Sequence, residues 1–246
     1  MKKSAVVFFL VVFIGVIFSY IILRIGFLGS EDNFFNAKLR PHFSKYVILR
    51  QIFSLHFDGD AKTDFLGKGY GNILIEVDSM DKYDFDLSTL DLLAKKIQEI
   101  TKKPTTYIFS DENIPYTEAL NSQKIKEITK MNRDYFNNQK RAAIYLLVGS
   151  RDEKQPSLLG STLDEYGIVL FMDALLDFTQ DSPDNTLVNY EVSTILHEFG
   201  HQIGLPHNSE PNCLMNEQVE IHSGVFESLN SIIMDFCDLE KQSIQQ

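Results

Sequence analysis

Residues 197–207 read HEFGHQIGLPH and concentrate three of the chain's six histidines within eleven residues. Apolar side chains recur at helical spacing between residues 188 and 199, which predicts a helix that leads into this segment. Gly204 and Pro206 are typical of a helix end, so the last of the three histidines would lie beyond the helix. The fold must therefore support one helix and the turn after it, with polar side chains from both in a single region.

These polar side chains have the spacing of a zinc site. His197 and His201 are four residues apart, so a helix brings them to one face, where both imidazoles can reach one ion. Catalytic zinc usually has three protein ligands and one open position. Gly204 tolerates a positive φ, so the chain can turn back there and bring His207 to the same ion. Glu198 lies beside the ion without ligating it, as a general base should.

Two other interpretations remain open for these residues. Histidines at this spacing also occur by chance as surface or core residues, although the glycine and third histidine at fixed offsets favour the metal site. The second alternative is a membrane-tethered module that holds zinc without catalysing a reaction. Glu198 argues against it, because a structural zinc site is closed and needs no carboxylate beside an open position.

The segment fits the pattern H-E-x-x-H-x-x-G-x-x-H, and the chain resembles the metzincin metallopeptidases. CLMN at 213–216 puts Met215 where that superfamily has its Met-turn, a tight turn whose methionine lies beneath the zinc ligands. HNSEPNCLMN, together with the later FCDLE, is similar to the archaemetzincins within that superfamily. The resemblance implies an α/β (α+β) fold, with a twisted mixed sheet, an active-site helix and a small C-terminal subdomain. It also implies zinc-dependent hydrolysis of peptide bonds in peptide or protein substrates.

The chain has two cysteines, Cys213 and Cys237. Their residue type and number allow a disulfide in an oxidising compartment, a pair of metal ligands, or two buried thiols. Archaemetzincins bind a second, structural zinc through four cysteines, of which this chain matches only these two. Asn208 and Glu240 stand at the other two positions, and the spacing from Met215 to Cys237 is longer than the family pattern. The match to a second zinc site is therefore incomplete, and in an exported domain a Cys213–Cys237 disulfide fits these residues at least as well.

An apolar run from Ala5 to Leu23 follows two lysines at the N-terminus. About 20 apolar residues are needed to span a bilayer, whereas the apolar part of a signal peptide has about 7–15. We therefore expect a short tail at 1–4 and a transmembrane signal anchor at 5–28. The preceding lysines favour a single-pass protein with its catalytic domain outside the cytoplasm. Basic residues after the run weaken this asymmetry, so a cytoplasmic peptidase held at the membrane is the alternative.

The rest of the chain predicts one domain after a linking segment. Residues 29–67 mix charges and aromatics without a clean period, which indicates a stalk or pro-region. A single catalytic α/β domain is then expected at 68–246. Its predicted elements are strands at 72–78, 105–111, 142–150 and 166–175, with helices at 87–103 and 117–138. The resemblance implies that the segment from 159 to 172 is an edge strand whose backbone, at residues 166–172, pairs with an extended substrate.

Charge and one short motif complete the sequence evidence. The chain has 34 acidic and 23 basic residues and a net charge of −11, which disfavours a nucleic-acid partner because like charges repel. FDGD at 57–60 is similar to an element by which astacin pro-regions place an aspartate on zinc. Asp60 is therefore a candidate for blocking the site, with an ordinary solvated loop as the alternative.

Overall fold

The computed structural model describes most of the chain in two units. Its described residues are 2–27, 33–39, 43, 46–53, 61–110, 114–137, 140–163, 166–180, 186–216 and 232–245. Contacts divide the chain into Met1–Asp60 and Ala61–Gln246. Each unit has its own cluster of packed apolar side chains, so each is described separately.

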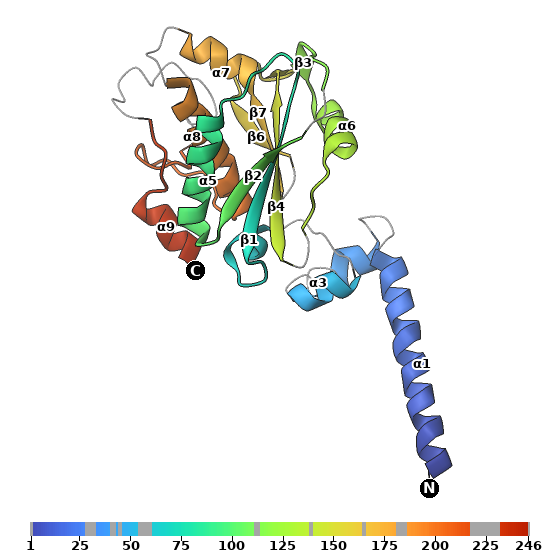
Figure 1. The fold of residues 1–246 in the computed structure, drawn as a ribbon. Helices are drawn as coiled ribbons and strands as arrows, with labels where there is room; N and C mark the ends of the chain where they lie inside the picture. The colour runs from blue at the N-terminus through green and yellow to red at the C-terminus, as the bar shows by residue number, and fades with distance from the viewer. Residues whose placement is uncertain are drawn as a thin grey trace. The chain divides into compact units, whose positions relative to one another are not determined.

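The N-terminal unit begins with the long helix α1, Lys2–Phe27 (Figure 1). Its segment Phe9–Phe27 has a mean hydropathy of 2.4 and is long and apolar enough to cross a membrane. After it come a π-helical turn, η1 (Phe35–Leu39), and a short helix, α3 (Val47–Phe53). The rings of Phe27, Phe43 and Phe53 pack on one another with centroids 5.5–5.7 Å apart. Part of the predicted stalk is therefore helical and packed.

A five-stranded sheet forms the centre of the C-terminal unit, in the order β2-β1-β4-β7-β6. Four strands are parallel and β6 is antiparallel to its neighbour β7. The strands are β1 (Asn72–Ser79), β2 (Thr105–Phe109), β4 (Arg141–Gly149), β6 (Gly160–Thr162) and β7 (Gly167–Phe171). The central strand β4 is buried along almost its whole length, as its uninterrupted apolar sequence predicts. A separate pair of short strands, β3 (Ala119–Leu120) and β5 (Arg151–Asp152), completes the strand content of the described residues.

Helices cover both faces of the sheet (Figure 1). One face carries α5 (Leu87–Thr101) and α8 (Thr186–Gln202), which pack against each other, and α6 (Ser122–Asn132) lies on the other. The start of α5 is capped by Asp86, whose carboxylate accepts a hydrogen bond of 2.8 Å from Ser88 N. The other helices among the described residues of this unit are α4 (Ala61–Leu66), α7 (Met172–Thr179) and α9 (Asp238–Gln245). The predicted α/β class with a mixed sheet is confirmed.

Three details differ from the sequence prediction. The compact unit begins at Ala61, before the predicted boundary at residue 68, because the fully buried ring of Phe65 packs against Tyr166 and Phe199. The strand expected at 166–175 ends at Phe171, and α7 follows it directly. The helix expected at 117–138 is shorter, because β3 occupies its first residues.

The edge strand that was expected to pair with substrate also lies at other residues than predicted. Residues 167–171 pair with β4 on one side and with β6 on the other, so their backbone groups are already used within the sheet. Among the described residues, the outer strand on this side is β6, Gly160–Thr162. The expectation that residues 166–172 form the edge was therefore wrong, and the edge lies earlier in the same segment.

Candidate metal centre

Helix α8 carries the first three predicted site residues into the interior of the C-terminal unit. It contacts α5 on one side and strands β6 and β7 on another. Its residues from Glu191 to Gly200 are all buried, including His197 and Glu198. The polar groups of the site are therefore placed on a rigid element that is surrounded by packed side chains.

The end of α8 has the turn that the sequence predicts. Gly204 has φ of +86°, which lies in the left-handed region that favours glycine. The backbone N–H of Leu205 donates to Gly200 O at 2.9 Å, and that of Gly204 donates to His201 O at 2.9 Å. These bonds satisfy carbonyls at the helix end while the chain reverses direction. The reversal brings His207 back to the helix.

The three predicted histidine ligands converge. Nε2 of His207 lies 3.2 Å from Nε2 of His197 and 3.0 Å from Nε2 of His201. One nitrogen from each ring lies within 4.8 Å of the others. His197 is buried, His201 is half-buried and His207 is exposed, so the group opens to solvent on the His207 side.

Two of the histidine rings, those of His197 and His201, form a hydrogen bond through Nδ1. These bonds determine that Nε2, the nitrogen that faces the other histidines, carries the lone pair. Nδ1 of His197 lies 2.6 Å from Leu214 O, and Nδ1 of His201 lies 3.0 Å from Leu205 O. A carbonyl oxygen can only accept, so each Nδ1 carries the proton and each Nε2 has the lone pair. Lone pairs that point at one another repel, and a divalent cation among them turns this repulsion into attraction. Three converging imidazoles, two of which are oriented by carbonyls through the other ring nitrogen, therefore suit zinc.

Glu198 is held beside this centre by the edge strand. Its carboxyl group is buried, and Oε2 accepts a hydrogen bond of 2.7 Å from the hydroxyl of Thr162 on β6. The close approach of β6 to α8 depends on Gly160, where a Cβ atom would lie 2.6 Å from Cγ2 of Thr194. Thr162 and Gly160 were not predicted as site residues. Small and hydroxyl residues in the LGST stretch were the only sequence signal for them.

Met215 lies beneath the helix, where the resemblance placed a Met-turn. Its side chain is fully buried, and a Cβ at position 200 would collide with its Sδ. Gly200 therefore permits the methionine to approach the helix backbone between His197 and His201. The turn also contains Cys213, whose sulfur is bonded to that of Cys237 at 2.01 Å. Of the three alternatives for the cysteines, the structure has the disulfide.

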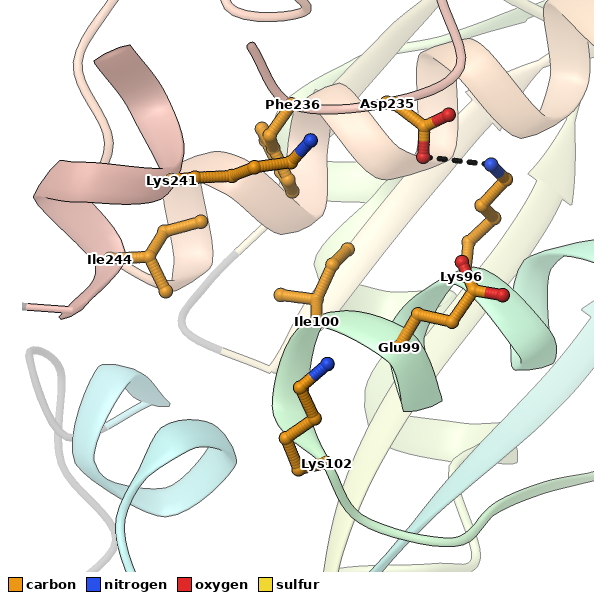
Figure 2. A pocket seen from close by; sticks show the side chains of 8 residues that line it. All are labelled: Lys96, Glu99, Ile100, Lys102, Asp235, Phe236, Lys241 and Ile244. Atoms are coloured by element: carbon orange, nitrogen blue, oxygen red, sulfur yellow. Dashed lines mark hydrogen bonds and ion pairs between the residues drawn. The ribbon is translucent and has the colours of Figure 1, made fainter. Parts of the chain in front are cut away.

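Two further polar features lie away from the histidines. Glu191 is buried between α8 and α5, where its carboxylate accepts a hydrogen bond from the Thr89 hydroxyl. Burial raises the pKa of Glu191 to about 7. A pocket of about 440 Å³ lies between α5 and α9, where Lys96 pairs with Asp235 at 2.7 Å. Figure 2 shows the side chains that line it. None of the predicted site residues lines this pocket.

Asp60, the candidate blocking residue, lies outside the described residues.

No protein-family model matches the sequence, and no curated protein matches it. A solved archaemetzincin from Methanopyrus kandleri has a TM-score of 0.50 at 14% identity, covering 71% of this chain and 94% of that one. The chain has an archaemetzincin-like fold.

Two further solved structures are similar at lower TM-scores. An archaemetzincin from Archaeoglobus fulgidus has a TM-score of 0.42 at 18% identity, covering 70% of this chain and 99% of that one. A zinc-dependent peptidase from Methanocorpusculum labreanum has 0.44 at 14% identity, covering 69% and 99%. At these identities the archaemetzincin likeness concerns the fold, so the chemistry of this chain must be argued from its own residues.

Proposed function

We propose that this protein is a zinc-dependent endopeptidase that hydrolyses peptide bonds and is anchored to a membrane by α1. The observation that carries the proposal is the convergence of three histidine Nε2 atoms, two of them oriented by carbonyl groups on the opposite ring nitrogen. A buried carboxylate beside them, from Glu198, adds the group that hydrolysis needs. The archaemetzincin-like fold supports the same reaction.

Each residue has a separate role in the proposed reaction. His197, His201 and His207 would hold the ion, which when bound polarises the scissile carbonyl and lowers the pKa of a water molecule toward about 7. Glu198 accepts a proton as water attacks and delivers it to the leaving nitrogen. The hydroxyl of Thr162 holds one oxygen of that carboxylate and so fixes its direction.

The edge of the sheet gives the substrate a place to bind. Strand β6 pairs with β7 on one side, and no strand pairs with its other side among the described residues. A peptide in an extended conformation can add to such an edge through backbone hydrogen bonds. Because Thr162 belongs to this strand and also bonds Glu198, a peptide along β6 would lie next to the proton-transfer group.

The membrane anchor and its orientation are part of the proposal. The length and hydropathy of α1 support a span, and the lysines before it favour a cytoplasmic N-terminus. The Cys213–Cys237 disulfide supports a catalytic domain outside the cytoplasm, because disulfides persist in oxidising compartments. Proteolysis of intact cells checks this: the catalytic domain should be digested without lysis, and full protection would support the cytoplasmic alternative.

The catalytic proposal is tested with purified protein and an unfolded protein substrate such as casein. We expect cleavage that a chelator abolishes and added zinc restores. Glu198→Gln should keep its zinc and lose most turnover, because the amide cannot accept the proton. Glu210→Gln makes the same change at an exposed glutamate and should cleave normally. A wild-type protein that binds one zinc ion and cleaves nothing would support the non-catalytic zinc module.

A further inference from the structure

A single buried carboxylate, that of Glu240, forms hydrogen bonds with the loops next to the candidate metal centre. Glu240 lies in the first turn of α9 and is only 3% exposed. It accepts four hydrogen bonds, two on each oxygen. The donors are Asn208 Nδ2 at 2.8 Å and Met215 N at 2.7 Å for Oε1, and Leu214 N at 3.2 Å and Cys237 N at 2.9 Å for Oε2.

The four donors come from three segments of the chain. Asn208 follows the third histidine, residues 214 and 215 belong to the Met-turn, and Cys237 precedes α9. The Cys213–Cys237 disulfide joins two of the same segments covalently. One carboxylate and one covalent bond therefore hold residues 208–215 against residues 237–240, which follow more than 20 residues later.

This carboxylate is connected to two of the zinc-ligand positions through the backbone. Leu214 donates its N–H to Glu240, while its carbonyl accepts from Nδ1 of His197 at 2.6 Å. Asn208 is adjacent to His207 in the chain, and its N–H donates to Met215 O at 2.9 Å. Movement of the Glu240 carboxylate would therefore shift the groups that orient both histidines.

The second, structural zinc of the archaemetzincin pattern does not fit these residues. Zinc binds cysteine as the thiolate, whereas both sulfurs here are bonded to each other. Both oxygens of Glu240 face N–H donors, which a metal bound at the same oxygens would have to displace. The sulfurs and a Glu240 oxygen do lie within 4.8 Å of one another, so a reduced metal site is the competing arrangement.

We propose that Glu240 and the Cys213–Cys237 disulfide form a metal-free tie that holds the Met-turn and positions His197 and His207. The chain consequently binds one zinc ion, not two. Glu240 is a positioning residue, because it acts on the ion only through backbone groups and the histidines. This inference rests on the proposed zinc site.

The first test uses full-length wild-type protein purified in detergent without reductant. Mass spectrometry of metal content should give one zinc per chain, and a thiol-reactive dye should detect no free thiol. Cobalt in place of zinc should give a spectrum without a thiolate-to-metal charge-transfer band. Two zinc ions per chain, free thiols or such a band would each overturn the proposal.

The second test changes the carboxylate with little change in shape. Glu240→Gln removes the charge and places an amide donor against backbone N–H donors, so zinc affinity measured by chelator competition should fall about 10- to 100-fold. The ligand-field bands of cobalt in the site should also shift, because the histidines reorient. A purely structural role would lower the melting temperature without moving these bands.

Asp238→Asn is the matched control for this change. Asp238 is an exposed carboxylate in the same first turn of α9, so its variant also removes one negative charge from the helix N-terminus. Its zinc affinity should stay within about twofold of wild type. Equal losses in the two variants would show a charge effect alone and contradict the proposal.

The disulfide is tested by the double variant Cys213→Ser, Cys237→Ser, which should hold its single zinc more weakly than wild type. Affinity equal to wild type would remove the disulfide from the tie. The casein assay separates this inference from the proposed function. A protein that carries one zinc but cleaves nothing refutes catalysis alone, whereas a protein that cleaves casein with two zinc ions refutes the tie alone. Wild-type protein without zinc refutes both.

Discussion

Replacing Glu191 by glutamine should stabilise the protein at neutral pH. Burial between α8 and α5 raises the pKa of this carboxyl to about 7, from an ordinary value of 4.5. The folded state therefore binds a proton between these pH values that the unfolded state has lost, so the free energy of unfolding falls as pH rises through this window. At pH 8, this difference between the folded and unfolded pKa values lowers the free energy of unfolding by roughly 3 kcal/mol.

Glu191→Gln removes this pH dependence of the unfolding free energy because a glutamine has no charge to bury. Its amide oxygen can still accept the hydrogen bond from the Thr89 hydroxyl. Urea unfolding of residues 61–246, with a chelator present to exclude zinc linkage, should show Glu191→Gln more stable than wild type at pH 8. At pH 5 most of this difference should disappear. Glu99→Gln changes an exposed glutamate on α5 and should show no such trend. A Glu191→Gln difference that is the same at pH 5 and pH 8 would refute the reasoning.

Three other substitutions test the site itself. Thr162→Val should lower kcat about 10- to 100-fold with little change in KM, because Glu198 loses its orienting hydroxyl, and Thr162→Ser should retain most activity; steady-state kinetics would decide. His201→Ala should lose both zinc and cleavage, and a variant that keeps its zinc by mass spectrometry would argue against this ligand. Gly200→Ala should destabilise the protein by about 1–3 kcal/mol in thermal melts, since the collision with Met215 outweighs the usual helix preference for alanine; an unchanged melting temperature would contradict this.

The histidine cluster was predictable because its geometry is local. A spacing of four residues on a helix and a glycine turn with φ of +86° place the histidines without reference to the rest of the fold. The strand and helix order of the C-terminal unit was predictable for a similar reason, since apolar periodicity reports which faces are buried. β1, α5 and β4 lie close to their expected positions.

The partners of the site were not predictable, because they depend on contacts between distant parts of the chain. Thr162 bonds Glu198 across 36 residues, and Glu240 bonds Leu214 across 26. An apolar strand such as residues 167–171 also carries no local signal of whether one or two neighbours pair with it, which explains the misplaced edge. The disulfide could not be chosen over a metal site from two cysteines alone.

The unequal exposure of the three histidines has a kinetic consequence. His197 and His201 are fixed on a packed helix, whereas His207 stands on the solvent side, after the turn at Gly204. An incoming ion would first bind His197 and His201, which α8 already holds in place, and would bind His207 last. Metal exchange would then require rotation of the exposed His207 side chain, without opening of the hydrophobic core around α8.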